Sequence, residues 1–227
     1  MARTLDPVAY AVRRDAFVDA AQELIVTRGY ERMSIQDVLD RADASRGAFY
    51  HYFDSKEGLL TAVIDRMAEA AIATLQPMVD DPGLTAAEKF ERLFAGIAQW
   101  KHDRKDLVLA VLDIWRSDDN AIVRERYRRD VIVRVVPLLT DIIRQGMAEG
   151  TFEVASAEDT ARMLVMVIAG MGDLAGDLFV GRRDGTVTFE EVERTFQSYR
   201  QSADRLLGAS PGTLTFVSDD TLNEWFG

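Results

Sequence analysis

The chain has 227 residues and a formal net charge of −11, from 38 acidic and 27 basic side chains. Cysteine is absent and the two histidines, His51 and His102, lie far apart, which excludes disulfides and thiol nucleophiles and argues against a metal site. The acidic balance argues against non-specific binding to nucleic acid, so any contact with DNA must be made by a local surface.

Neither a membrane helix nor a signal peptide is expected. The longest apolar run, Met163 to Gly172, is far shorter than the ~20 residues that a membrane helix needs. The N-terminus carries Asp6, Arg13 and Arg14 where a signal peptide would need an apolar stretch. We therefore expect a soluble, cytoplasmic protein that does not contact a membrane.

Apolar residues recur mostly at helical spacing, which predicts an all-α fold. The first helix is expected to run from Pro7, with Asp6 as its cap, to Arg28, and Gly29 ends it as a left-handed residue would. It carries an apolar stripe made of Phe17, Ala20, Ala21, Leu24 and Ile25.

Two short helices follow, from Ser34 to about Arg41 and from Arg46 to about Tyr52, with Ser45 as the cap of the second. A tight turn joins them. A pair of this kind has the proportions of a helix-turn-helix unit, whose second helix enters the major groove of DNA by its N-terminal residues.

The remaining helices are longer. One is expected over Ser55–Leu75 and ends before Pro77. The stretch Asp106–Trp115 is apolar nearly all round and should be central, and Pro137 should kink a helix over Asn120–Glu149. Four capping pairs mark helix starts: Ser34 with Asp37, Thr85 with Glu88, Ser156 with Asp159, and Thr188 with Glu191. The helix that Ser156 opens should end near Val180, and the helix that Thr188 opens should end at Gly208.

The second helix of the short pair can present a surface to DNA. Phe49 and Phe53 are four residues apart and should face inward. Arg46 can bridge two acceptors on a guanine edge, and small neighbours let the backbone approach the groove. The amides that open the next helix, together with Lys56, attract a phosphate. The residues left outside are Arg46, Gly47, Ala48, Tyr50, His51 and Tyr52.

Other roles remain open for several of these side chains. Tyr50 and Tyr52 could be core aromatics, and an exposed His51 needs no function. Three arginines near the N-terminus could contact phosphates or be solvated. They are Arg3, Arg13 and Arg14.

The string from Ala42 to Glu57 resembles the signature of the tetracycline-repressor (TetR) family of bacterial transcription regulators. Gly29-Tyr30, Ser34-Ile35 and the apolar stripe of the first helix match the same pattern, so the resemblance covers roughly Phe17 to Leu60. Two positions depart from the pattern. Asp43 stands where the family usually has Gly, and Gly58 stands where it often has Glu. Asp tolerates the left-handed conformation, so the turn can survive.

The resemblance implies a three-helix helix-turn-helix DNA-binding domain over residues 1–55 and a helical ligand-binding and dimerisation domain over residues 56–208. Residues 209–227 form a tail with several apolar side chains, which we expect to dock on the body. The positions that match DNA contacts of the family are Ser34, Gln36, Arg46, Gly47, Ala48, Tyr50, His51, Tyr52 and Lys56.

The resemblance also implies a homodimer, in which the helices over Ala157–Val180 and Thr188–Leu207 pair with those of a second chain. Small residues on the first of these helices favour close packing, although the same faces could build a core within one chain. The predicted interface residues are Gly170, Val192, Phe196, Tyr199, Ala203 and Leu206.

A small-molecule pocket is expected among the C-terminal helices, because such pockets are mostly apolar and Met adapts to varied ligands. The same residues could be plain core. Asp173 and Asp177 could receive a cationic ligand, pair with an Arg of a neighbouring helix, or be solvated. The candidate ligand-binding residues are Phe94, Trp100, Trp115, Tyr127, Met147, Met163 and Met166.

The predicted function is a ligand-responsive DNA-binding transcriptional regulator, a repressor that a small molecule releases from a palindromic operator on double-stranded DNA. An alternative is a helical ligand-binding or scaffolding dimer without specific DNA binding, which the acidic charge keeps open. An enzyme is not expected, because no catalytic constellation can be named, and no cofactor or metal is predicted.

Overall fold

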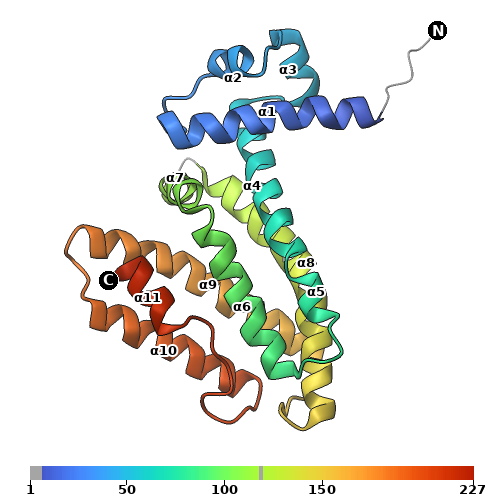
Figure 1. Cartoon of the computed structure of the whole chain (residues 1–227), viewed down its shortest axis with the longest axis vertical. Coiled ribbons are helices and arrows are strands. Elements are labelled where there is room, and N and C mark those ends of the chain that lie inside the picture. Colours follow the sequence, from blue (N-terminus) through green and yellow to red (C-terminus); the bar gives the residue numbers. More distant parts are fainter. Residues whose placement is uncertain (1–6, 118–119) are drawn as a thin grey trace. The chain divides into compact units, whose positions relative to one another are not determined.

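A computed structural model describes residues 7–117 and 120–227 as helices joined by turns, with no strand in those ranges (Figure 1). The all-α class is therefore confirmed. Two predictions fall outside the described ranges: the cap at Asp6 and the possible phosphate contact at Arg3. In chain order the helices are α1 (Pro7–Arg28), α2 (Ile35–Arg41), α3 (Arg46–Tyr52), α4 (Lys56–Ala73), α5 (Gln76–Val79), α6 (Ala86–His102), α7 (Lys105–Arg116), α8 (Ala121–Glu149), α9 (Ala157–Arg183), α10 (Phe189–Leu206) and α11 (Asp219–Phe226).

The chain divides into two compact units. The first consists of residues 1–69 and 104–127, and the second of residues 70–103 and 128–227. The DNA-binding domain was expected over residues 1–55. Its described part, residues 7–55, packs together with the first part of α4, with α7 and with the start of α8. Both α4 and α8 are continuous helices that begin in the first unit and end in the second.

The core of the first unit is built on the apolar stripe of α1. Phe17 and Ala21 are fully buried, and Phe49 of α3 and Leu59 of α4 complete the centre. The expectation that α7 is central is wrong, because Ile114 is its one buried side chain among those described. This helix packs one face on α1, so most of its apolar residues stay partly exposed.

The core of the second unit is formed by α6, α8, α9 and α10 together with the tail. Phe90, Leu139 and Leu164 are fully buried in it. Figure 1 shows α9 and α10 side by side, with α11 packed on both. The tail enters this core through Leu214 and Phe216, whose side chains are almost fully buried.

The capping pairs fix where most helices begin. Ser34, Thr85 and Thr188 each accept a hydrogen bond from the backbone N–H three residues later, and the acidic side chain there accepts from the cap in return. Serine caps open α3 and α9 as predicted.

The helices differ from the sequence prediction most clearly at the end of α9 and at Pro77. The helix that was expected to end near Val180 continues to Arg183. A Cβ on Gly181 would lie 2.4 Å from Cγ2 of Val187, so this glycine lets the following loop fold back on the helix rather than ending it. One further helical turn, α5, forms at Pro77, where the chain was expected only to break.

Candidate nucleic-acid interface

The turn between α2 and α3 adopts a conformation that few side chains tolerate. Asp43 has a φ of +46°, the one positive φ outside glycine among the described residues. Asp tolerates this left-handed conformation better than most residues, as predicted for this position. Nη2 of Arg13 donates a hydrogen bond of 2.8 Å to the carbonyl oxygen of Asp43, so α1 braces the turn.

Two phenylalanines anchor α3 on the core of the first unit. Phe49 and Phe53 are 0% and 5% exposed, which confirms that they face inward. Their ring centroids lie 5.6 Å and 6.1 Å from that of Phe17, both at nearly perpendicular angles. Aromatic pairs favour this edge-to-face geometry, so the orientation of α3 is well defined.

One surface of α3 is open to solvent. Tyr50 is 49% exposed and Arg46 is exposed as well. A Cβ on Gly47 would meet only Oγ of Ser45, at 4.0 Å, so the surface there is flat and unobstructed. These three residues form the reading tip, the name used below for Arg46, Gly47 and Tyr50.

Arg46 differs from other arginines of the same unit. Arg28, Arg41 and Arg66 each form an ion pair with an acidic residue of the chain. For Arg46, no hydrogen bond or ion pair to another described residue is found. Its five N–H donors are therefore available to an outside partner, which is the requirement for bridging acceptors on a guanine.

The other predicted contacts on α3 differ in exposure. His51 is exposed, whereas Tyr52 is half-buried and packs on Phe17 and Tyr10 of α1. Ala48 is also half-buried, and its N–H donates to Oγ of Ser45 over 3.2 Å. The structure therefore brings the predicted α3 residues to one helix but exposes them unequally.

Three predicted contacts lie outside α3, and each has a partner within the chain. The Ser34 hydroxyl donates to Asp37 over 2.6 Å, and Nε2 of Gln36 donates to Asp40 over 2.8 Å. Both residues remain exposed at the start of α2.

Lys56 is held more firmly than the sequence suggested. Its Nζ donates to the carbonyl oxygen of Glu31 over 3.3 Å and lies 4.1 Å from the centroid of the Tyr30 ring. Burial raises the pKa of Tyr30 well above its ordinary value. Lys56 thus connects the start of α4 to the loop after α1, and its side chain is half-buried.

The arginines of α1 have structural roles that the sequence did not reveal. Arg13 braces the turn at Asp43, and the guanidinium of Arg14 lies 5.4 Å from the centroid of the Phe53 ring. Their partners are 30 and 39 residues away, so no local pattern could have found these contacts.

The candidate ligand-binding residues are divided between the two units and differ in exposure. Trp115 and Tyr127 pair at a ring distance of 5.0 Å on the core of the first unit, whereas the other five belong to the second unit. Phe94 and Trp100 are buried there. The three methionines are exposed, by 40% at Met147, 49% at Met163 and 52% at Met166.

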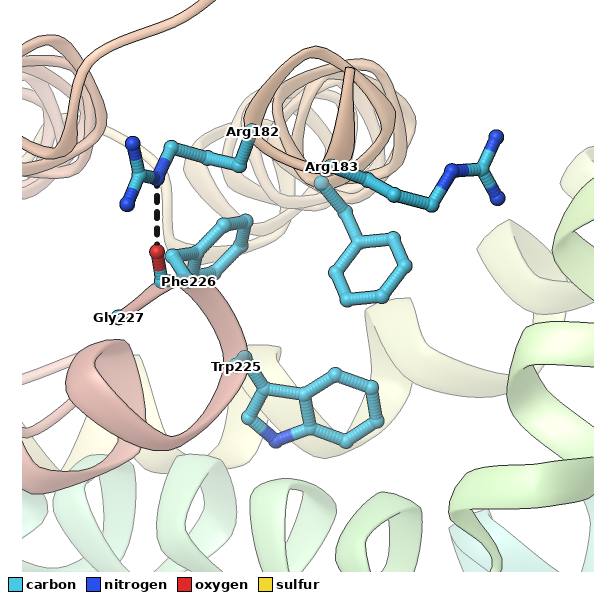
Figure 2. A pocket seen from close by; sticks show the side chains of 6 residues that line it. Arg182, Arg183, Trp225, Phe226 and Gly227 are labelled. Atoms are coloured by element: carbon cyan, nitrogen blue, oxygen red, sulfur yellow. Dashed lines mark hydrogen bonds between the residues drawn. The ribbon is translucent and has the colours of Figure 1, made fainter. Parts of the chain in front are cut away.

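A pocket of about 160 Å³ lies between the end of α9 and the end of α11. Figure 2 shows the side chains that line it. Arg182 donates to the carbonyl oxygen of Phe226 over 2.7 Å and so joins the two segments. No candidate ligand-binding residue lines this pocket. Its lining residues are Phe179, Arg182, Arg183, Trp225, Phe226 and Gly227.

The candidate dimer residues differ in how far they are buried within their own unit. Val192 and Ala203 are fully buried within their own unit, so they offer no surface to a second chain. Phe196 packs on Phe226 of the tail at 5.6 Å. The remaining three, Gly170, Tyr199 and Leu206, are partly exposed.

One open question about α9 is answered by an ion pair. Nη2 of Arg128 donates to Oδ2 of Asp173 over 2.8 Å, so pairing with an Arg of a neighbouring helix is the role found for this carboxylate. Asp177 is exposed. Within the described ranges, no three His, Asp or Glu side chains are grouped so that they could hold a metal ion.

Comparisons with known proteins agree with this geometry. The model of the family "Bacterial regulatory proteins, tetR family" matches residues 17–63, the span that holds the turn and α3. An HTH-type transcriptional regulator of Lactococcus lactis subsp. lactis is 42% identical over 52 residues, which are 23% of this chain and about a quarter (26%) of that protein. The HTH-type transcriptional repressor DhaR of Mycobacterium sp. (strain GP1) is 27% identical over 181 residues, which are 80% of this chain and 83% of that protein.

A solved structure extends the likeness in fold to most of the chain. A TetR transcription regulator from Haloarcula marismortui matches with a TM-score of 0.62 and 23% identity, over 87% of this chain and 97% of that one. The signature at the turn and α3, the family match over the same residues and the shared all-helical fold lead to one conclusion. Residues 17–63 carry the signature of the TetR family of bacterial regulatory proteins, and most of the chain is similar in fold to a regulator of that family.

Proposed function

We propose that the chain is a repressor that binds a palindromic operator as a homodimer and leaves it when a small molecule binds. The reading tip carries this proposal, because it is exposed, rests on buried Phe49 and Phe53, and holds an arginine without a partner in the described chain. Residues 45–52 contain one arginine and no acid, in a chain of net charge −11. Attraction to DNA is therefore local, and it favours docking by α3 over docking by any other face.

The exposed surface of α9 supports the homodimer. This helix is the one in the described ranges whose length and apolar composition would suit a membrane span, and 22% of that stretch is buried. Met163 and Met166 are about half exposed on it. TetR-family regulators are soluble cytoplasmic DNA-binding proteins, so we assign this surface to a second copy and place the protein in the cytoplasm. Two copies related by a two-fold axis would meet two operator half-sites.

Release by a ligand requires a connection between the two units. α4 begins next to α3 and ends in the second unit, so any movement it makes is transmitted along a continuous helix. A ligand shifts the equilibrium only if it binds the released state more tightly than the DNA-bound state. We place its site in the second unit, where Phe94 and Trp100 are the buried members of the predicted set.

The test begins with an operator selected from random duplex DNA. Arg46→Ala should weaken its binding by about 1–3 kcal/mol, or roughly 5- to 150-fold, because a bidentate contact to a guanine is lost. Arg144→Ala is the matched control, since it removes the same charge from a side chain that is 62% exposed on α8. Fluorescence anisotropy measures both variants.

Two results would contradict the proposal. Equal operator affinity of Arg46→Ala and wild type would show that the reading tip does not read a base. Failure to enrich any sequence would favour the alternative, a helical ligand-binding or scaffolding dimer that does not bind specific DNA.

A further inference from the structure

Three aromatic rings meet where the end of α3 lies on the start of α1. The ring centroids of Tyr10 and Tyr52 are 4.6 Å apart, those of Tyr10 and His51 are 5.8 Å apart, and those of His51 and Tyr52 are 5.0 Å apart. Two of these residues are candidate DNA contacts. The third, Tyr10, received no role from the sequence.

The position of Tyr10 on α1 explains how it reaches them. Tyr10 and Phe17 are seven residues apart, so they lie on one face of the helix. Phe17 is 5.7 Å from the Tyr52 ring, which means that Tyr52 is held at two points along α1. His51 packs against Tyr10 with its ring plane inclined by 74°, an edge-to-face arrangement.

The part of α1 around Tyr10 is mostly exposed. Its neighbours on the same part of α1, Val8 and Val12, are 70% and 66% exposed. Tyr10 itself is half-buried, and the ring contacts found for it are to His51 and Tyr52. Its packing therefore serves the end of α3.

We propose that Tyr10 is a positioning residue that fixes the orientation of the His51 and Tyr52 rings toward DNA. This inference rests on the proposed function. A ring held in one orientation before binding loses less conformational freedom when it meets its partner, so preorganisation increases affinity for the sequence that fits. The aromatic ring of Tyr10 supplies this effect, and its hydroxyl is not needed.

The first experiment uses the free protein. The chain has only two histidines, so proton NMR resolves their ring signals, and His51→Gln assigns them. Tyr10→Leu should move the His51 signals toward their positions in the unfolded chain, because the ring current of Tyr10 is lost, and should leave those of His102 in place. Tyr10→Phe and the control Val12→Ala should leave both in place.

The second experiment measures binding to the selected operator and to unrelated duplex DNA at one salt concentration. Tyr10→Leu should weaken operator binding about 3- to 10-fold, the size expected for losing one or two ring pairs, and should change binding to unrelated DNA little. Tyr10→Phe and Val12→Ala should bind as wild type does. In a His51→Ala background, Tyr10→Leu should cost less than it does alone, because the two residues act together.

Each contrary result overturns the inference in a different way. A Tyr10→Phe variant as weak as Tyr10→Leu would show that the hydroxyl contacts DNA directly. An equal loss on operator and unrelated DNA would indicate a purely structural role. If the NMR shift occurs but wild-type protein binds no specific DNA, the proposed function is wrong. The DNA role of Tyr10 is then wrong as well, although the contacts among the three rings are confirmed.

Discussion

At the scale of single residues, the fold does not require glycine at position 47. Its φ is not positive and a Cβ there would meet no atom closer than 4.0 Å, so the fold would accept a side chain. Gly181 is the contrary case, because a Cβ there would collide with Val187. What makes Gly47 useful in our account lies outside the chain, in the DNA that approaches the reading tip.

This difference gives a prediction in which stability and binding change in opposite directions. Gly47→Ala should raise the stability of the fold, by up to about 1 kcal/mol, because Ala is the better helix former. It should lower operator affinity, because the added methyl group meets the groove. Urea unfolding and anisotropy measure the two quantities. Unchanged or tighter binding would show that DNA does not approach Gly47 closely.

At the scale of helices, three complete capping boxes hold carboxylates at helix starts. The backbone N–H of Thr85 donates to Glu88 over 2.8 Å, and that of Thr188 donates to Glu191 over 2.7 Å. These backbone hydrogen bonds, followed by those from the threonine hydroxyls, lower the pKa of both glutamates below its ordinary value. Hydrogen bonds to the charged form have this effect generally.

The lowered pKa values predict how stability depends on pH. Because the folded state holds these carboxylates ionised, their contribution is complete above the ordinary pKa of about 4.3 and is lost as the pH falls through the lower folded values. The double variant Glu88→Gln and Glu191→Gln should therefore be less stable than wild type at neutral pH. Urea midpoints measured across the acidic range should show this gap narrowing. A gap that does not depend on pH would refute the capping role of the charges.

The tail depends on one buried carboxylate. Asp204 is 3% exposed and accepts hydrogen bonds from the backbone N–H groups of Gly212, over 2.8 Å, and Leu214, over 3.1 Å. Asp204→Ala would leave two N–H groups without this acceptor, and the one on Leu214 is buried, which costs about 1–3 kcal/mol. Residues 209–217 should then be cut faster by proteases. Asp204→Asn keeps one acceptor and should fall between wild type and Asp204→Ala, whereas three equal cleavage rates would exclude this anchoring.

The helix starts could be predicted from the sequence because caps act over three residues. Ser34, Ser45 and Thr85 needed only their neighbours to be recognised. Contacts between distant segments could not be predicted in this way. Lys56 on Tyr30 and Arg13 on Asp43 depend on how helices meet, and they redirected two residues that had been considered for phosphate contacts. The same limit explains why the candidate pocket residues, which were chosen from pattern alone, fall in two different units and differ in exposure.

At the scale of the whole molecule, the net charge of −11 and the exposed surface of α9 both favour DNA binding by a dimer rather than by a single chain. An acidic chain gains little from binding DNA non-specifically, so its affinity must come from two reading tips that bind together. Dimerisation through α9 would supply the second tip. Binding by two linked sites exceeds the affinity of either one alone.

Breaking the proposed dimer should therefore abolish tight binding. The double variant Met163→Glu and Met166→Glu places charges on the exposed stripe of α9, and sedimentation should show it as a single chain where wild type is a pair. Its operator affinity should fall by more than tenfold, on the order expected when linkage is lost. Met147→Glu, on an α8 residue that is 40% exposed, is the control and should leave both properties unchanged. A monomeric wild type would contradict the assignment of α9.

The most direct test of the account is the symmetry of the DNA that this chain selects. Wild-type protein should enrich an inverted repeat whose half-sites lie about one helical turn apart or a multiple of it, and each duplex should bind an even number of chains. Arg46→Ala should enrich no such sequence. Selection of a site without two-fold symmetry, or the same inverted repeat selected by Arg46→Ala, would contradict the claim that paired reading tips recognise the operator.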